Sequence, residues 1–463
     1  MGTVRVGRMF PISFVKEASS GVSSALLVGR AIVASIATVI SLFCDPVSAK
    51  EGRIMRASDM IRLTGVNTHM TYNDGAYANS ENVLKDLQFL GVSHIRDSLP
   101  GADSQPALQG RDALRRLVHQ GVKLNIFFPS GWNATSIAWL RSLEAAAPGA
   151  IVSVEGYNEI NNFPPKFEGL SGPAAAKAGQ KALYDAIKSD PVLKHVPVLD
   201  MTGFEMIKDP TFTYGTTLDD YADVLNVHAY AQNGAPPGIW INPERPAIYK
   251  GLKAELPKTI TEFGYSSRPE SNWGFIGVDE RTQAKGILNG LFDAARSGYD
   301  RVYLYELLDE KPDPELKDLG FHFGLFTFAN EPKLAARAIR NLTQVLGSAA
   351  GADKERTDPL PSNTSIDVKI DGPDDNMPVF WIVLLRENGS PIVALWRETP
   401  FWDRANGRPL EAPSIPAKVS FGKACGSIRT YDLFQSSDPK SVSAGSSLTV
   451  GVVDRVQLVE CAS

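Results

Sequence analysis

Cysteine is scarce in this chain: its 463 residues include 3 cysteines, Cys44, Cys425 and Cys461. That number is too small for a disulfide-framework fold, and no two of them have the CxxC spacing of a metal or redox motif. HExxH and P-loop patterns are absent as well, and no GxGxxG follows the first predicted strand. No motif of metal-dependent, nucleotide-dependent or thiol chemistry is therefore present, and we expect no metal and no organic cofactor.

An excess of positive charge is also lacking. Lys and Arg number 47 against 52 Asp and Glu, which gives a formal net charge of −5. We find no stripe of Lys and Arg that would follow a phosphate backbone, so we expect no nucleic-acid partner. Hydrophobic residues make up 43% and charged residues 21% of the chain, as in ordinary globular proteins.

The chain has no apolar run of bilayer length. Its longest candidate, the 13-residue stretch Ala31–Phe43, is short against the roughly 20 residues that span a membrane. Basic residues precede this stretch, and the small residues ending at Ala49 resemble a signal-peptidase site. We therefore predict a signal peptide over residues 1–49, rather than an N-terminal anchor, and a secreted or periplasmic protein with no stable membrane span after its removal.

Export would leave Cys425 and Cys461 as the remaining cysteines, both on predicted strands near the C-terminus. In an oxidising compartment the two can pair. The alternative is a pair of buried free thiols, and we favour the disulfide.

From about residue 61 the chain alternates short apolar runs with amphipathic helical stretches. Eight strands alternating with helices over roughly 280 residues are typical of a (β/α)8 barrel, the fold class that we predict. The predicted strands are residues 62–67, 92–97, 122–128, 151–159, 196–203, 224–230, 258–264 and 301–309. An open doubly wound sheet is the alternative.

The character of the chain changes after the predicted helix Pro332–Leu346. A polar stretch rich in small residues, 347–365, reads as a linker or long surface loop. Alternating β-like runs then follow to the C-terminus, with the spacing of a small β-sandwich. We therefore expect a catalytic barrel over residues 50–350 and a β-sandwich domain over 351–463.

Polar side chains gather where the predicted barrel strands end, which is the functional face of such a barrel. Asn158 and Glu159 follow the fourth strand, and Glu262 ends the seventh. These two strands face each other across the mouth of an eight-stranded barrel. Two opposed carboxylates about 5 Å apart are what retaining glycoside hydrolysis requires, one as proton donor and the other as nucleophile.

An Asn-Glu pair after the fourth strand and a TEFG segment at the seventh resemble the signature of clan A glycoside hydrolases. The resemblance extends over the whole barrel, and the trailing β-domain is similar to that of glycoside hydrolase family 39. It implies that Glu159 is the general acid/base and Glu262 the nucleophile. It further implies that Asn158 binds the sugar 2-hydroxyl, while Arg96 and Tyr230 keep Glu262 ionised and oriented.

Other candidates for substrate binding are side chains at or just beyond the ends of the remaining strands: His69, His228, Trp132, Tyr305 and Glu306. Each has a structural alternative. The histidines can be core residues, Trp132 can cap a helix, Glu306 can pair with Arg301, and Arg96 can neutralise the interior Glu155. Ile160 stands where many relatives have a proline, and Tyr305 where they have a tryptophan, so the sugar is not assigned.

The leading functional hypothesis is a retaining glycoside hydrolase that cleaves a poly- or oligosaccharide by double displacement. A non-catalytic carbohydrate-binding protein on a degenerate barrel is a second hypothesis, although such a protein has no need of both glutamates. A transglycosidase is a third, since it uses the same residues and differs in whether water or a sugar hydroxyl reaches the intermediate. The carbohydrate is the expected partner; the oligomeric state and the choice between endo and exo action are open.

Overall fold

The structure is a computed structural model that describes residues 52–99, 103–129, 131–203, 221–241, 256–268, 276–347, 366–370 and 379–462. The predicted signal peptide, 1–49, lies outside the described residues, as does most of the predicted linker. No described helix is long and apolar enough to cross a membrane.

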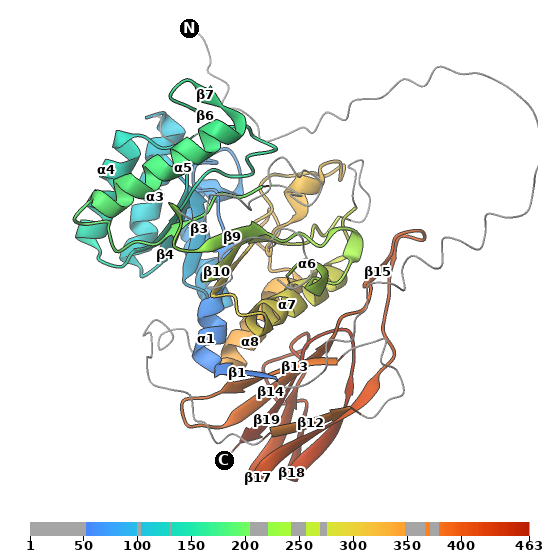
Figure 1. Ribbon diagram of the computed structural model, residues 1–463. Coiled ribbons are helices and arrows are strands. Elements are labelled where there is room, and N and C mark those ends of the chain that lie inside the picture. The colour runs from blue at the N-terminus through green and yellow to red at the C-terminus, as the bar shows by residue number, and fades with distance from the viewer. Residues whose placement is uncertain are drawn as a thin grey trace, which may run out of the picture. The chain divides into compact units, whose positions relative to one another are not determined.

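Eight parallel strands form a barrel, which confirms the predicted fold class (Figure 1). Hydrogen-bonded neighbours follow one another in the order β8-β5-β4-β3-β2-β11-β10-β9. A bridge between Leu199 and Val224, with a bond from Asp200 N to Val224 O of 3.0 Å, joins β8 to the residue before β9 and closes the ring. The barrel strands are β2 (Thr64–Asn67), β3 (His94–Ser98), β4 (Lys123–Phe127), β5 (Ile151–Glu155), β8 (Val198–Leu199), β9 (Leu225–His228), β10 (Lys258–Phe263) and β11 (Arg301–Leu304).

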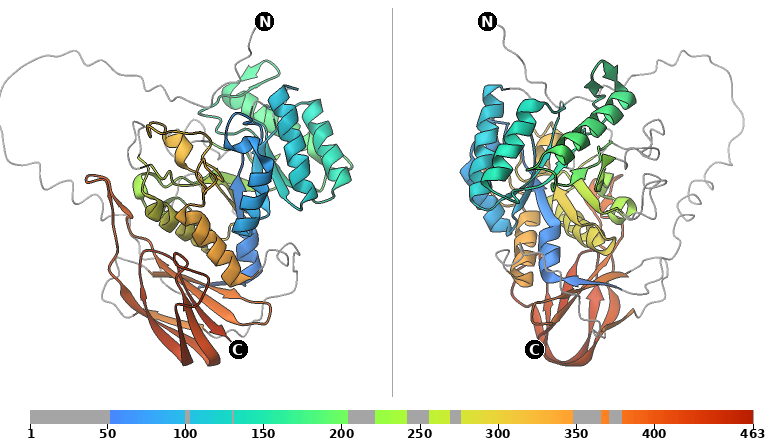
Figure 2. Two further views of the ribbon diagram at one scale, coloured as in Figure 1. Left: turned by 180° about the vertical axis from the view of Figure 1, so that it is seen from behind. Right: turned by 60° about the vertical axis from the view of Figure 1, so that its left-hand side comes forward.

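Seven of the eight barrel strands lie within the predicted ranges, and β3 ends one residue beyond its range, at Ser98. Buried parallel strands are recognisable as short β-branched apolar runs. Helices on the outside of the strands cover the barrel (Figure 2). They are α1 (Ala57–Leu63), α2 (Ser80–Leu90), α3 (Gln105–His119), α4 (Ala134–Ala146), α5 (Gly172–Ser189), α6 (Gly238–Ile241), α7 (Glu280–Arg296) and α8 (Leu334–Leu346), with short 3-10 turns η1 (Ala76–Ala78), η5 (Gln232–Gly234) and η7 (Leu319–His322).

Side-chain caps mark where several helices begin. Asn133 and Ser136 form a reciprocal capping box at the start of α4, and the side chain of Asp279 accepts the Thr282 N–H at the start of α7. Each cap satisfies backbone donors that a helix end leaves unpaired, which fixes where the helix begins. Two small hairpins, β6 (Lys166–Phe167) with β7 (Leu170–Ser171) and β15 (Trp402–Asp403) with β16 (Arg408–Pro409), lie outside the main sheets.

The C-terminal part forms a separate mixed sheet of seven strands, in the order β1-β13-β14-β19-β17-β12 with β18 paired to β17. Its strands are β1 (Arg53–Arg56), β12 (Ile366–Ile370), β13 (Val379–Leu385), β14 (Pro391–Arg397), β17 (Ile415–Tyr431), β18 (Ser441–Val452) and β19 (Gln457–Ala462). A disulfide joins Cys425 and Cys461, as we expected, and links β17 to β19.

Strands β13 and β14 are apolar on both faces because each face packs against a different core. On β13, Val383 and Leu385 pack into the core of the sheet domain, whereas Ile382 and Leu384 belong to the core that includes the barrel helices. The alternation follows from the two-residue period of a strand. Trp396 Nε1 on β14 donates to Asp293 Oδ1 on α7 at 3.0 Å, so the sheet and α7 share polar as well as apolar contacts.

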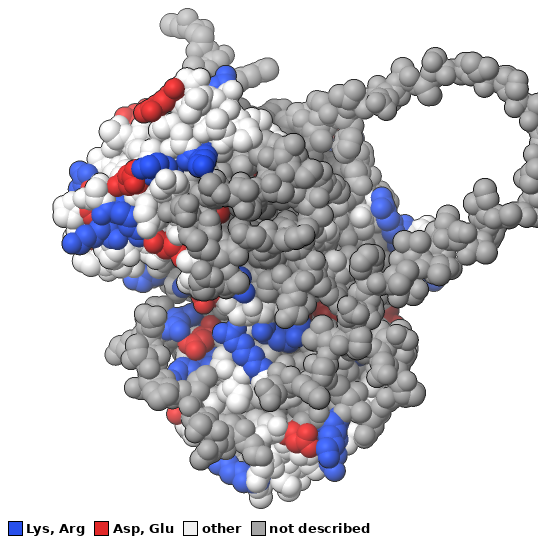
Figure 3. Space-filling model, viewed as in Figure 1, with Lys and Arg blue, Asp and Glu red and all other residues white. Residues whose placement is uncertain are grey.

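Two features of this sheet were not predicted. The N-terminal strand β1 pairs in parallel with β13, so residues 53–56 belong to the C-terminal sheet. Strand β17 is one continuous element of 17 residues, longer than the short runs that the sequence pattern indicated. Charges of both signs are interspersed on the face that Figure 3 shows, among the residues coloured there.

Candidate active site

The ends of the barrel strands bring six of the predicted site residues together. Register pairs Asn67 with Arg96 across β2 and β3, and pairs His228 with Glu262 across β9 and β10. Glu159 follows β5, on the opposite side of the mouth from β10. The members of this cluster are Arg96, Asn158, Glu159, His228, Tyr230 and Glu262.

Arg96 is the centre of the cluster and is almost fully buried. Its guanidinium donates to Glu262 Oε1 at 2.7 Å, to both oxygens of Glu155 at 2.8 and 3.0 Å, and to Asn158 Oδ1 at 2.7 Å. Arg96 therefore pairs with both Glu262 and the interior Glu155, the two carboxylates between which the sequence analysis left its role open. Burial opposes its charge, but the carboxylates of Glu155 and Glu262 outweigh this effect and raise the pKa of Arg96.

Glu262 accepts a strong donor on each carboxylate oxygen. Arg96 Nη1 lies 2.7 Å from Oε1, and the Tyr230 hydroxyl donates to Oε2 at 2.8 Å. Burial raises the pKa of Tyr230 well above its ordinary value, and the charge of Glu262 raises it further. Tyr230 therefore remains a donor, and both carboxylate oxygens of Glu262 are held in a fixed orientation.

Glu159 has a different environment, with no Lys or Arg paired to it among the described residues. Its Oε1 lies 3.0 Å from His228 Nδ1, and its Oε2 accepts from Asn162 Nδ2 at 3.3 Å. The backbone of Glu159 has φ +46, in the left-handed region that non-glycine residues rarely adopt. Its N–H donates to Thr202 Oγ1 at 3.0 Å, a contact that holds this unusual conformation.

The two glutamates are close enough for a double-displacement reaction. One oxygen of Glu159, one oxygen of Glu262 and a ring nitrogen of His228 all lie within 4.8 Å of one another. Retaining glycosidases have carboxyl groups about 5–5.5 Å apart, whereas inverting enzymes need roughly 6.5–9.5 Å to admit a water. The nearest oxygens of the two carboxyl groups are thus closer together than the gap that inverting enzymes need.

A second cluster lies beside the first, at the ends of β2 and β11. His69 Nε2 lies 3.3 Å from Glu306 Oε2 and 3.9 Å from Glu310 Oε1. The Tyr77 hydroxyl donates to Glu306 at 2.9 Å. Burial and the nearby charge of Glu310 raise the pKa of Glu306 well above its ordinary value, and burial raises the pKa of Glu310 to about 7. Burial lowers the pKa of His69 to about 4.

Tyr305 connects the two clusters. Its ring lies edge-on to Tyr230, with centroids 6.3 Å apart, and edge-on to His69 at 5.6 Å. The peptide bond between Tyr305 and Glu306 is cis. Trp132, by contrast, packs near Phe167 and donates to Gly179 O at 3.4 Å, and these contacts do not reach either cluster.

Sequence reasoning missed Thr202, Asn162 and Glu310. Thr202 lies near the end of the fifth predicted strand, 196–203, so its place there was a usable signal. Asn162 belongs to the Asn-rich segment after β5, and its contact with Glu159 depends on the turn that follows. Glu310 lies several residues beyond β11, where strand periodicity no longer predicts direction.

Two sets of described residues have donor atoms close enough to hold a metal ion: Glu159, His228 and Glu262, and His69, Glu306 and Glu310. In the first set a cation would compete with the Arg96 guanidinium, which already lies 2.7 Å from Glu262. The second set has no such cation paired with it among the described residues.

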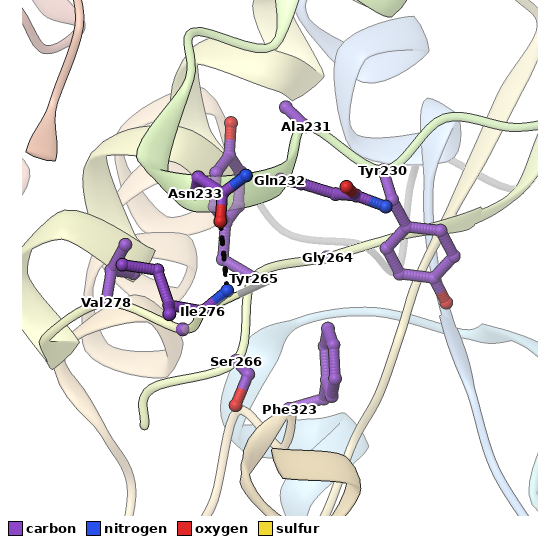
Figure 4. A pocket seen from close by; sticks show the side chains of 11 residues that line it. Tyr230, Ala231, Gln232, Asn233, Gly264, Tyr265, Ser266, Ile276, Val278 and Phe323 are labelled. Atoms are coloured by element: carbon purple, nitrogen blue, oxygen red, sulfur yellow. Dashed lines mark hydrogen bonds between the residues drawn. The ribbon is translucent and has the colours of Figure 1, made fainter. Parts of the chain in front are cut away.

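A small hollow adjoins Tyr230 of the first cluster (Figure 4). Tyr230, Tyr265 and Phe323 are among the side chains that line it, and Asn233 Oδ1 accepts the Ile276 N–H there at 2.9 Å. The hydroxyl of Tyr230 points away from the hollow in Figure 4. The Tyr230 hydroxyl thus faces Glu262, to which it donates, and its ring lines the hollow.

No family model matches the chain, and no curated protein matches it either. Solved structures do resemble it. The GH39 enzyme from Xanthomonas axonopodis pv. citri is 14% identical over 87% of this chain and 94% of its own, with a TM-score of 0.49. A monomeric β-xylosidase from Caulobacter crescentus CB15 is 15% identical over 89% and 97%, with a TM-score of 0.46.

The endo-β-1,4-mannanase from Thermotoga petrophila is more distant, at 12% identity over 86% of this chain and 93% of its own, with a TM-score of 0.37. At these identities the likeness concerns the fold, and the chemistry has to be argued from the site itself. Two of the similar solved structures are described as GH39 enzymes.

Proposed function

We propose that the protein is a retaining glycoside hydrolase, with Glu262 as nucleophile and Glu159 as general acid/base. The observation that carries this proposal is the contrast between two close carboxyl groups. Glu262 is held by a guanidinium and a phenol, whereas the charged or polar partners of Glu159 are His228 and Asn162. Opposite environments on two neighbouring carboxyls support opposite roles.

In the first step, Glu262 attacks the anomeric carbon of the sugar while Glu159 gives its proton to the leaving oxygen. The C–O bond to the leaving group breaks, and a covalent bond from the sugar to Glu262 forms. In the second step, Glu159 takes a proton from water, and that water displaces Glu262 with the original configuration restored. The reaction needs no redox partner.

Asn158 is suited to bind the sugar beside the nucleophile. Its Oδ1 accepts from Arg96 Nη2 at 2.7 Å, which orients the amide so that its NH2 group is left to donate. A donor at this position fits the 2-hydroxyl of the reacting sugar, where a hydrogen bond strengthens in the transition state. His228 lies between the two carboxyls, 3.0 Å from Glu159 and 3.5 Å from Glu262, and orients both.

We also propose that the protein acts outside the cytoplasm. The apolar N-terminal stretch supports export, and the Cys425–Cys461 disulfide suits an oxidising compartment.

The test is release of reducing sugar from a broad panel of plant and bacterial polysaccharides. Wild type is compared with Glu262→Gln, Glu159→Gln and the exposed matched control Glu81→Gln. We expect release by the wild type and the control, and a loss of at least about 10²–10⁴-fold in both site variants. Release that survives Glu262→Gln contradicts the proposal.

A second experiment separates the two glutamates. An aryl glycoside with a good leaving group needs no proton from Glu159, so Glu159→Gln should still form the covalent intermediate, and added azide should restore its turnover. Azide should not restore retaining turnover to Glu262→Gln. The opposite pattern reverses the assignment of the two roles.

A further inference from the structure

The second cluster brings the carboxyl groups of Glu306 and Glu310 together with the imidazole of His69. Among the described residues, no Lys or Arg forms an ion pair with either glutamate. Lys333 is engaged with Asp309 at 2.8 Å, and Lys311 with Asp74 at 2.7 Å. Two carboxyl groups therefore meet an imidazole at a buried position without a cation of their own.

Two polar atoms of this cluster have no hydrogen-bond partner among the described residues: His69 Nε2 and Glu306 Oε1. Both residues are more than nine-tenths buried, His69 at 4% and Glu306 at 0% exposure. A buried polar atom without a partner carries a free-energy cost, which a bound ion can remove. The two side chains meet where His69 Nε2 lies 3.3 Å from the other oxygen of Glu306, Oε2.

We propose that His69, Glu306 and Glu310 bind one divalent transition-metal ion, for which Zn²⁺ is the best match. An imidazole with two carboxylates is a donor set for Zn²⁺, whereas Ca²⁺ and Mg²⁺ prefer oxygen ligands throughout. Ligands at ~2.0–2.2 Å in a tetrahedron lie roughly 3.3–3.6 Å from one another. The His69 nitrogen lies 3.3 and 3.9 Å from the two carboxylate oxygens, and all three donor atoms lie within 4.8 Å of one another, so small side-chain movements would bring them to ligand spacing.

The surroundings already orient one ligand as metal sites require. Tyr77 donates to Glu306 Oε2 at 2.9 Å, and the Leu308 N–H donates to the Tyr77 hydroxyl at 3.0 Å. Outer partners of this kind fix a carboxylate in place before the ion binds.

The ion would join the segment after β2 to the segment after β11, next to Tyr305. It would act as a structural clamp at the barrel mouth and not in the bond cleavage that Glu159 and Glu262 carry out. The same donor types occur in Glu159, His228 and Glu262, but there Arg96 competes with a cation. We therefore expect one tight site per chain, in the second cluster.

The test is equilibrium dialysis of the metal-stripped full-length chain against Zn²⁺. Wild type should bind one ion per chain, and Glu310→Gln and His69→Gln should lose that binding. Tyr77→Phe should weaken it by roughly 10–100-fold, as an outer partner does. Glu159→Gln is the matched control, because it removes one carboxylate from the other set, and it should bind like the wild type.

Circular dichroism in the presence of chelator shows whether each variant is folded. Glu310 is partly exposed and Gln has the same shape, so this variant tests the site even if His69→Gln fails to fold. Absence of stoichiometric Zn²⁺ binding overturns the proposal, as does binding that is lost in Glu159→Gln but kept in Glu310→Gln. The measurement involves no sugar, so its failure is distinct from a failure of the proposed glycosidase activity.

Discussion

Replacing Arg96 with Met removes the one cation shared by Glu155 and Glu262. The side chains of these glutamates are only 2% and 10% exposed, so both charges would remain buried without compensation. Removing one partner of a buried ion pair costs about 3–5 kcal/mol. Since total stabilities are on the order of 5–15 kcal/mol, Arg96→Met should still fold but with a much lower urea midpoint.

The cause of this loss can be tested with a second substitution. In Arg96→Met/Glu155→Met one of the two uncompensated carboxylates is gone, and we expect roughly 2 kcal/mol of the lost stability to return. Activity should not return, because Glu262 still lacks its donor. The surface pair Arg115–Asp112, with side chains 42% and 63% exposed, supplies the control: Arg115→Met should cost under about 1 kcal/mol.

Urea unfolding followed by tryptophan fluorescence gives the free energies, and sugar release gives the activity. Our reasoning is refuted if Arg96→Met costs no more than Arg115→Met. It is also refuted if the double variant is as unstable as the sum of its two single variants, since the charges would then not be coupled.

Two further predictions concern the C-terminal sheet and its contact with α7. The Cys425–Cys461 disulfide closes a loop with a sequence separation of 36 residues. Reducing it should lower the free energy of unfolding by up to about 4 kcal/mol. An unchanged urea midpoint in reductant would contradict this. Burial, and then Asp293, raise the pKa of Glu398 well above its ordinary value. The folded state therefore keeps a proton that the unfolded state has lost, so the free energy of unfolding falls as pH rises above the ordinary Glu value. Glu398→Gln should flatten that slope between pH 5 and pH 7, and urea midpoints at both pH values check it.

Much of the barrel was predictable because its information is local. Each strand is a short buried run, and each intervening helix has apolar residues at helical spacing, as in Gln283–Arg296. The strand ends then place Glu159 and Glu262 opposite each other without any knowledge of the loops.

What escaped prediction depends on distant contacts. The sequence of Arg53–Arg56 is too short to indicate that this segment pairs with β13, which lies more than 300 residues away in the chain. The disulfide-linked strand β17 contains Gly422 and Gly426, which resemble turn signals although the strand continues through them. Trp132 looked like a platform for sugar, but its contacts depend on the hairpin that holds Phe167.

The configuration of the first product tests the central claim most directly. Proton NMR can record the anomeric signal of newly released sugar within minutes, before mutarotation mixes the anomers. Double displacement through Glu262 predicts that the first-formed anomer has the same configuration as the bond that was cleaved. A first-formed anomer of the opposite configuration would contradict the retaining mechanism.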